Sequence, residues 1–336
     1  MNDIISLCEL TGVSGFEFEI SSKIAKLFEK YCEQTNIDAF GNVAGIIGKG
    51  NKIKIMIEAH LDEIGLIVKN IDSEGFIRFA CIGGVNPSIL PAAEVFIHGK
   101  ETLFGVVGSK PPHLQTAEES KKEYKTEELY IDVGFSQKEL AEKIQIGDPI
   151  SFACKSATLI NNMLVSKAID NRMGVSCLLR CMQRLRTKPT NFEIVFLAAV
   201  QEEIGCKGAK VGTYRISPDY AIIIDVTHGT TPYTKDKDSA FELGKGAAIG
   251  VGPNFHPGLT RKIIESAGQL PYAIEVCSSN SGTDAWVVQI TKKGIPCALI
   301  SAPLKYMHSP VEMVCNDDVN IIVDIICNFL EEGYIC

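Results

Sequence analysis

Acidic and histidine side chains gather where the predicted strands of this 336-residue chain end. Those that follow or close a predicted strand, or open the helix after it, are His60, Asp62, Asp170, Glu202, Glu203, Asp225 and His308. Carboxylates and imidazoles bind divalent cations, and they also accept and release protons. In an open α/β sheet, ligands bind outside the carboxyl ends of the strands. Five strand ends are therefore expected to bring these residues to one edge of a sheet.

Acids brought together in this way would repel one another, and a buried carboxylate is costly without a partner or a metal ion. Two divalent cations would balance the carboxylates of Asp170, Glu203 and Asp225 together with one hydroxide. Each cation would take one histidine (His60 or His308), one terminal carboxylate and one shared carboxylate. Oxygen and imidazole ligands suit zinc, cobalt or manganese, with zinc or cobalt favoured.

The remaining acids are predicted to assist these ligands. Asp62 lies two residues beyond His60 and is placed to orient that imidazole by a hydrogen bond. Adjacent side chains of an extended segment point in opposite directions, so Glu203 can bind a cation while Glu202 acts as the general base. Taken singly, these residues allow simpler interpretations: Asp170 as a helix cap, and the two glutamates as a solvent-exposed pair.

Alternating strands and helices must position these residues. The expected strands are 53–57, 192–200, 220–226, 273–277 and 295–301, and the expected helices are 17–31, 171–186, 258–267, 283–289 and 317–330. Nearly all-apolar strands that alternate with helices indicate a sheet covered on both faces. The pattern predicts a mixed-sheet α/β/α catalytic domain formed by residues 1–65 and 161–336.

Residues 66–160 have a different pattern. Six short β-rich runs (65–71, 76–82, 94–98, 104–108, 129–133 and 149–153) are separated by loops rich in glycine, proline and charge. Such dense short strands predict a small β-barrel-like domain inserted into the catalytic domain. The polar stretch 116–128 is expected to be an exposed loop.

Composition excludes several classes of protein. The net charge is −8 and there is no basic block, which argues against a nucleic-acid-binding protein. The longest apolar stretches, such as 194–200, are far shorter than the roughly 20 residues that span a bilayer. No basic-then-apolar leader opens the chain, and its twelve cysteines contain no Cys-x-x-Cys pair. We therefore expect a cytoplasmic protein with free thiols and no membrane association.

Several segments resemble one known family. They are 58–65 (EAHLDEIG), 168–172 (AIDNR), 201–205 (QEEIG), 224–228 (IDVTH) and 307–312 (MHSPVE), together with 11–17, 110–114 and 281–285. In this order they resemble the glutamyl aminopeptidase and tetrahedral aminopeptidase family of dinuclear metallopeptidases. The resemblance covers essentially the whole chain.

The resemblance implies a role for each candidate residue. His60 and Asp225 would hold one cation, Glu203 and His308 the other, and Asp170 would bridge the two. Glu202 would be the general base, Asp62 the orienting acid, and the Asp170–Asn171 peptide bond would be cis. The β-rich insertion would be a dimerisation domain, and the homo-oligomer would be a dodecamer built from dimers. The substrates would be peptides with a free N-terminus.

Other functions also fit these residues at the sequence level. A related dinuclear carboxypeptidase or deacylase would use the same ligands, and a non-catalytic metal-binding protein would keep them without needing Glu202. A glycoside hydrolase would use Glu202 and Glu203, but neighbouring residues are poorly arranged to flank a glycosidic bond at about 5 Å or more.

A few residues near these motifs have two interpretations each. His228 and His256 either approach a bound peptide or are surface histidines, and His113 is favoured as a structural or interface residue. Thr283 and Asp284 either cap the helix that they open or, as the resemblance implies, line the site.

Overall fold

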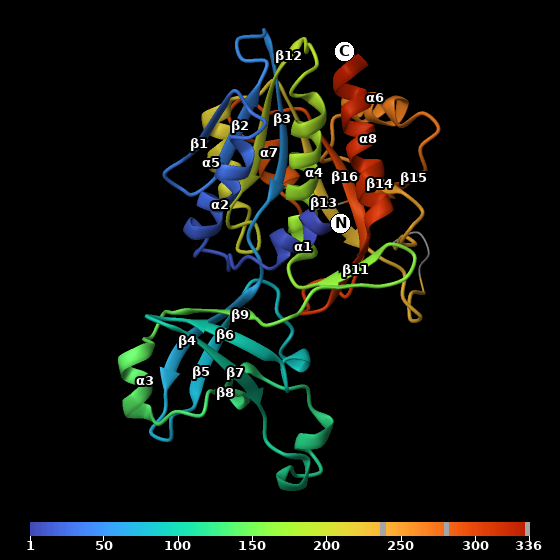
Figure 1. The fold of residues 1–336 in the computed structure, drawn as a ribbon. Helices are drawn as coiled ribbons and strands as arrows, with labels where there is room; N and C mark the ends of the chain where they lie inside the picture. Colours follow the sequence, from blue (N-terminus) through green and yellow to red (C-terminus); the bar gives the residue numbers. More distant parts are fainter. Residues whose placement is uncertain (236–239, 279–281, 333–336) are drawn as a thin grey trace.

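A mixed sheet of eleven strands and a closed barrel of six strands make up the fold (Figure 1). The computed structural model describes residues 1–235, 240–278 and 282–332. The strands of the sheet are β1 (Gln34–Ile37), β2 (Val43–Ile47), β3 (Ile53–His60), β10 (Ala157–Thr158), β11 (Met163–Ser166), β12 (Phe192–Ala199), β13 (Tyr220–His228), β14 (Ala247–Val251), β15 (Tyr272–Val276), β16 (Cys297–Lys305) and β17 (Glu312–Cys315). The predicted fold class, α/β with a small β-barrel, is confirmed.

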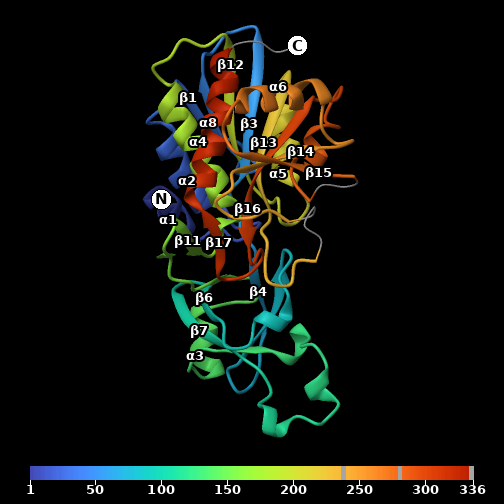
Figure 2. The same ribbon diagram turned by 90° about the vertical axis from the view of Figure 1, so that its right-hand side faces the viewer.

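Four parallel strands, in the order β12-β3-β13-β16, form the centre of the sheet. The register pairs Ala199 at the end of β12 with His60 at the end of β3. Asp225 of β13 pairs with Ser301 of β16. Because the strands are parallel, their carboxyl ends meet at one edge, which faces the barrel (Figures 1 and 2).

Helices cover both faces of the sheet because each central strand is apolar on both sides. Ile55 and Ile57 of β3 face one core and Met56 between them faces the other, as alternation in a strand requires. The first core packs against α1 (Asn2–Cys8), α2 (Phe18–Phe28), α4 (Ile169–Leu185), α6 (Pro257–Ala267) and α8 (Asn316–Glu332). The second packs against α5 (Lys207–Ile216) and α7 (Ala285–Val288). In Figure 1, α4 and α8 lie in front of the sheet.

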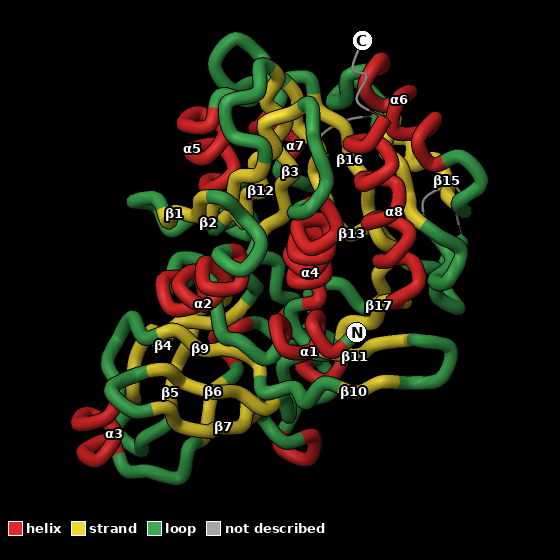
Figure 3. Tube along the Cα trace, turned by 45° about the horizontal axis from the view of Figure 1, so that its top comes forward, coloured by secondary structure: helices red, strands yellow, loops and turns green. Residues whose placement is uncertain are grey.

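The barrel contains strands close to all six predicted β-rich runs. Its closed order is β4-β5-β8-β7-β6-β9. The strands are β4 (Gly65–Ile71), β5 (Ile77–Ile82), β6 (Glu94–His98), β7 (Thr102–Gly108), β8 (Tyr130–Asp132) and β9 (Pro149–Phe152), and α3 (Gln137–Lys143) packs beside them. It encloses its own apolar core, separate from the two cores of the sheet. Figure 3 shows the barrel beside the ends of the sheet and the β10–β11 hairpin.

Some element boundaries differ from the predicted ones. Strand β13 continues to His228, so Asp225 lies inside the strand and not at its end. The continuation follows from pairing with β16, which extends over the whole of 221–228. The short strands β1, β2, β10, β11, β14 and β17 were not predicted, because pairing with neighbouring strands forms them and their own residue pattern does not mark them.

Two expectations from composition can be compared with the described residues. Their eleven cysteines are all free thiols, as predicted, and Cys336 lies outside the described residues. Among the described helices, none combines the length and the apolar character that crossing a membrane requires.

Candidate active site

The structure brings all seven predicted residues together at the carboxyl edge of the central strands. Asp170 lies between two imidazoles: its Oδ1 is 3.1 Å from Nε2 of His60, and its Oδ2 is 3.6 Å from Nε2 of His308. His60 ends β3, His308 follows β16, and Asp170 opens α4. The two oxygens of one carboxylate thus face two different histidines.

Each histidine also faces a second carboxylate. Nε2 of His60 is 3.9 Å from Oδ1 of Asp225, and Nε2 of His308 is 3.3 Å from Oε2 of Glu203. Ligand atoms of His60, Asp170 and Glu203 all lie within 4.8 Å of one another, a spacing that suits a bound metal ion. These contacts are compatible with the arrangement that the resemblance implied, in which Asp170 lies between the two imidazoles.

The electrostatics of this cluster favour bound cations. Burial raises the pKa of Glu203 and of Asp225 well above their usual values, and the charge of Asp170 raises both further. Within the described part of the chain, none of these three acids forms an ion pair with a lysine or arginine. The donor set of three carboxylates and two imidazoles therefore fits divalent cations, which would supply the missing positive charge.

His60 is held by acids on both sides of its ring. Asp62 Oδ1 lies 3.5 Å from its Nδ1, opposite the Asp170 contact at Nε2. Burial alone lowers the pKa of His60, but the nearby carboxylates of Asp170 and Asp62 outweigh that effect and raise the pKa well above its usual value. Asp62 is thus placed, as predicted, to orient the imidazole.

Asp62 also organises the loop that carries the two glutamates. It accepts hydrogen bonds from the backbone nitrogens of Glu202 (3.0 Å) and Glu203 (3.1 Å) and from Oγ of Ser14 (2.6 Å). Burial raises the pKa of Asp62, but His60 and these hydrogen bonds outweigh it, so that the pKa lies below the usual value. One buried carboxylate therefore fixes the position of both glutamates.

Glu202 and Glu203 lie in a turn, where the backbone nitrogens of Gly205 and Cys206 donate to the carbonyl oxygen of Glu202, so the extended segment expected here is wrong. Oε2 of Glu202 is 4.0 Å from Nε2 of His60, and its Oε1 accepts a hydrogen bond from Sγ of Cys206 at 3.4 Å. Burial raises the pKa of Glu202 to about 8. Ligand atoms of Glu202, Cys206 and Asp284 form a second group within 4.8 Å of one another.

The backbone at the start of α4 aims Asp170 into the site. Asp170 and Asn171 have non-helical backbone angles, and the Oδ1 of Asn171 accepts from the backbone nitrogen of Gly174 where the regular helix begins, so the simpler interpretation of Asp170 as the cap is wrong. The peptide bond between Asp170 and Asn171 is cis, as the resemblance implied. The Asn171 side chain is also held in place, because its Nδ2 donates to the carbonyl oxygen of Ile224.

Glu312 is a residue of the site that the sequence analysis did not single out. It is 2% exposed, and its Oε2 accepts from the backbone nitrogen of Asp170 (2.9 Å) while its Oε1 accepts from that of His308 (2.9 Å). One carboxylate on β17 thereby ties together two candidate ligands. The only sequence signal was its place in the 307–312 motif, four residues after His308.

We expect Glu312→Gln to weaken divalent-cation binding by about 10- to 100-fold, the range for groups that hold metal ligands in place. A glutamine side chain replaces one acceptor by an NH₂ group, which would face a backbone N–H. Titration of the metal-free protein with Co²⁺ measures this, and Glu142→Gln, on the exposed surface of α3, is the control. An unchanged cobalt affinity in Glu312→Gln would contradict the assignment.

The barrel contributes the other wall of the site. A Cβ atom built on Gly84 would lie 2.4 Å from Nδ1 of His308 and one built on Gly83 would lie 3.4 Å from Oε2 of Glu203. Only glycine allows the chain after β5 to approach His308 this closely. The Gly83–Gly84 segment therefore packs directly against two candidate ligands.

Other residues considered in the sequence have various roles. Asp284 makes no capping hydrogen bond to α7 and instead lies fully buried near Glu202, so the capping interpretation is wrong. His256 caps α6, with its Nδ1 accepting from the backbone nitrogen of Leu259. His228 is exposed and lines a cavity beside His308, and His113 lies in an exposed turn. Residue 281 of the predicted 281–285 motif lies outside the described residues.

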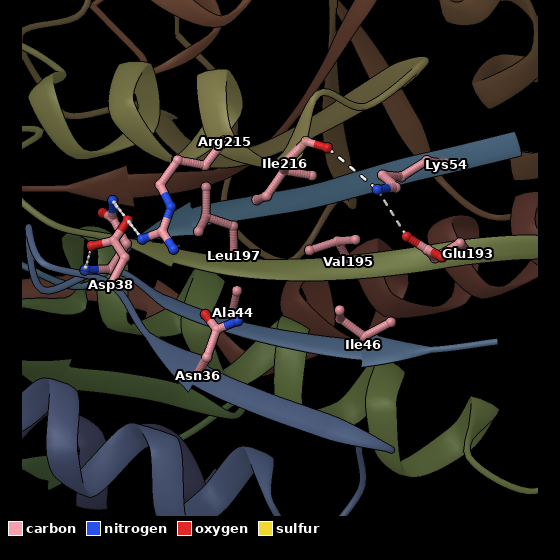
Figure 4. Close-up of a pocket in the computed structure, with 12 residues that line it drawn as sticks. Asn36, Asp38, Ala44, Ile46, Lys54, Glu193, Val195, Leu197, Arg215 and Ile216 are labelled. Atoms are coloured by element: carbon pink, nitrogen blue, oxygen red, sulfur yellow. Dashed lines mark hydrogen bonds and ion pairs between the residues drawn. The ribbon is translucent and has the colours of Figure 1, made fainter. Parts of the chain in front are cut away.

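A cavity elsewhere on the sheet has no candidate site residue in its lining. It measures about 220 Å³ and lies among β1, β2, β12, β3 and α5 (Figure 4). Lys54 pairs there with Glu193 at 2.9 Å and Arg215 with Asp38 at 3.3 Å. Because these charges neutralise one another, this cavity gives no reason to infer a ligand.

Comparison with known proteins agrees with this fold. Lysyl aminopeptidase of Pyrococcus furiosus is 35% identical over 333 residues, which are 97% of this chain and 95% of that protein. The solved structure of aminopeptidase APDkam598 from Desulfurococcus kamchatkensis has a TM-score of 0.92 at 35% identity and covers 98% of this chain and 94% of its own. The protein is an aminopeptidase, a hydrolase of peptide bonds.

Its family follows from the same comparisons. The chain belongs to the M42 glutamyl aminopeptidase family, whose model matches residues 41–325. TET1 peptidase of Pyrococcus horikoshii, which can assemble into a tetrahedron or a large octahedral shell, has a TM-score of 0.86 at 29% identity, with 98% of both chains covered. The resemblance inferred from the sequence is thereby confirmed.

Proposed function

We propose that this aminopeptidase uses two divalent cations to remove N-terminal residues from peptides. The observation that carries the proposal is the position of Asp170, whose two carboxylate oxygens face His60 and His308 separately. A carboxylate that binds a single cation does not need its two oxygens to face two different histidines. A single bridging acid between two imidazoles is the arrangement that a two-metal site requires.

The ligands follow from the contacts of the cluster. His60 and Asp225 would hold one cation, Glu203 and His308 the other, and Asp170 both. The cations, zinc or cobalt or else manganese, would lower the pKa of a water molecule toward about 7 and polarise the scissile carbonyl. The chain contributes the fixed geometry, through Asp62 behind His60 and Glu312 behind His308 and Asp170.

Glu202 is the residue that moves the proton. Its carboxylate lies beside the cluster, 4.0 Å from Nε2 of His60, and is not one of the five proposed ligands, so an oxygen is available to accept a proton from the attacking water. The same carboxyl group then delivers that proton to the departing amine. The backbone nitrogens of both glutamates donate to Asp62, and these hydrogen bonds fix the positions of the two residues for their different roles.

Assembly and location are part of the proposal. The assemblies of the TET1 relative support a homo-oligomer, with dimers formed through residues 66–160 and a dodecamer built from them. The free thiols of the described cysteines support a reducing compartment, the cytoplasm.

The enzyme loaded with Zn²⁺ or Co²⁺ is expected to cleave peptides with a free N-terminus and to leave their N-acetylated counterparts intact. A chelator should abolish this cleavage, and added Zn²⁺, Co²⁺ or Mn²⁺ should restore it. Product analysis by mass spectrometry distinguishes the loss of an N-terminal residue from the carboxypeptidase or deacylase alternative. Equal cleavage of acetylated peptides, or activity that survives metal removal, would contradict the proposal.

A further inference from the structure

Cys206, at the N-cap of α5, lies against the proposed general base. Its thiol donates to Oε1 of Glu202 at 3.4 Å and also faces the carbonyl oxygen of Thr283 at 3.8 Å. A thiol has one hydrogen and is a weak donor, so it cannot satisfy both oxygens. Burial raises the pKa of this thiol, and the charges of Asp284 and Glu202 raise it further. The sulfur therefore lies among oxygens that attract positive charge.

Asp284 is the innermost acid of this group. It is 1% exposed, and among the described residues neither of its side-chain oxygens has a hydrogen-bond partner. Its neighbour Glu58 is a second acid, fully buried, whose two oxygens also receive no hydrogen bond within the described chain. Two ionised carboxylates cannot donate to each other. Acids buried in this way are costly unless a proton or a cation joins them.

The spacing of three side chains at this place suits one cation. Ligand atoms of Glu202, Cys206 and Asp284 all lie within 4.8 Å of one another. In a tetrahedral zinc site a sulfur and an oxygen, bound at about 2.3 and 2.1 Å, lie about 3.5 Å apart. The distance of 3.4 Å between Cys206 Sγ and Glu202 Oε1 is close to that value. Glu202 and Cys206 are partly exposed, so that a cation can reach them from solvent.

This group differs in chemistry from the proposed two-metal cluster. It shares none of the five ligands proposed there, and it contains a thiol, which they lack. Thiolate ligands select zinc over manganese or magnesium, whereas carboxylates and imidazoles accept all of these more evenly. The two places are therefore expected to differ in metal preference.

We propose that Glu202, Cys206 and Asp284 form a further zinc site, and that a zinc ion bound there inhibits the enzyme. On binding, the ion replaces the thiol proton, which passes to solvent. The ion also occupies the carboxylate of Glu202, which then cannot accept a proton from the attacking water. Because the thiol must first lose its proton, the site fills only when zinc exceeds what the two-metal cluster takes up. The inhibition rests on the proposed role of Glu202, whereas the binding of the ion does not.

The number of ions per chain tests the site without a measurement of activity. Mass spectrometry of the folded protein in excess Zn²⁺ is expected to show one more ion per chain than in excess Mn²⁺. Cys206→Ser should lower the affinity for the additional ion at least about tenfold, since even groups that only hold ligands in place contribute 10- to 100-fold. Cys32→Ser, the same change at another partly exposed cysteine, is the control. An additional ion that is missing from the unmodified protein, or that Cys206→Ser retains equally, would overturn the site.

Cobalt gives an independent measurement of the thiol. A Co²⁺–thiolate bond absorbs in the near ultraviolet, and the five ligands of the proposed cluster offer only carboxylates and imidazoles. We expect this absorption to appear once the cluster is filled and to be absent from Cys206→Ser. Asp284→Asn keeps the shape of the side chain but removes its charge, and it should weaken cobalt binding at the thiol. If Cys206→Ser fails to fold, Asp284→Asn and the ion count of the unmodified protein still decide the inference. The same absorption in Cys206→Ser would overturn it.

Peptidase rates test the inhibition. With rising Zn²⁺ the rate is expected to reach a maximum and then to fall about 10²-fold or more at saturation, because a positioned general base contributes 10²- to 10⁴-fold. With Mn²⁺ the rate should rise and stay level. Relative to its own maximum, Cys206→Ser should need at least about tenfold more zinc for half-inhibition, and Cys32→Ser should need the same as the unmodified enzyme. Unchanged inhibition in Cys206→Ser would overturn the inference. No activity at any zinc concentration would instead contradict the proposed function, and the ion count would still decide the site.

Discussion

Glu202→Gln is expected to lower kcat by about 10²- to 10⁴-fold, the range that a positioned general base contributes. The glutamine amide keeps the size and the hydrogen-bonding capacity of the side chain but cannot take a proton from water. Bound metal should be unchanged, because Glu202 is not one of the five proposed ligands and its Oε1 accepts from the thiol of Cys206. Steady-state kinetics and metal analysis of the same preparation measure the two effects.

The neighbouring residue provides the matched control. Glu203→Gln makes the same chemical change one position along, but Glu203 lies 3.3 Å from His308 within the ligand group. We expect this variant to lose bound metal along with activity. Near-normal turnover by Glu202→Gln, or an equal loss of metal from both variants, would refute the assignment of Glu202 as the base.

Asp170→Asn is expected to release both cations and to reduce activity below detection. Replacing groups that merely hold ligands in place already costs 10- to 100-fold in metal affinity, so losing the charge of an acid shared by two cations is expected to cost more. The substitution keeps the shape of the side chain. The number of ions per chain, measured by mass spectrometry of the folded protein, gives the result.

Asp225, which the proposal assigns to one cation only, is the control for Asp170. Asp225 lies 3.9 Å from His60 and has no ion pair with His308 among the described contacts. Asp225→Asn should therefore release one ion per chain and retain the other. If Asp170→Asn also retains one ion, Asp170 is not the bridge and the two-metal proposal in its present form is wrong.

Much of the fold was predictable because the apolar strands are long and uninterrupted. The run 192–200 is nearly all apolar, a pattern that only a sheet with helices on both sides can bury, and 53–57 has one clearly apolar face. The barrel strands were found from alternation between turn residues. Short edge strands such as β1 (Gln34–Ile37) were missed, since their stability comes from pairing with a neighbour and not from their own residues.

The candidate site was predictable for a similar reason. Parallel strands end at one edge, so acids and histidines after several strands must meet there, whatever the loops between them do. Strand ends alone do not tell which acid faces which imidazole. The contacts of Asp170 with both histidines depend on how α4 begins after β11, which is a property of packing.

The sequence by itself determined the chemistry of the site: its acids and imidazoles, the edge where they meet, and the family to which they belong. Tertiary structure alone decided which groups hold that chemistry in place. Glu312 holds the backbone of Asp170, which lies more than 140 residues earlier in the chain. Gly84 packs against His308, which lies more than 200 residues later. Their effects depend on distances between distant segments, and local residue patterns carry no information about such distances.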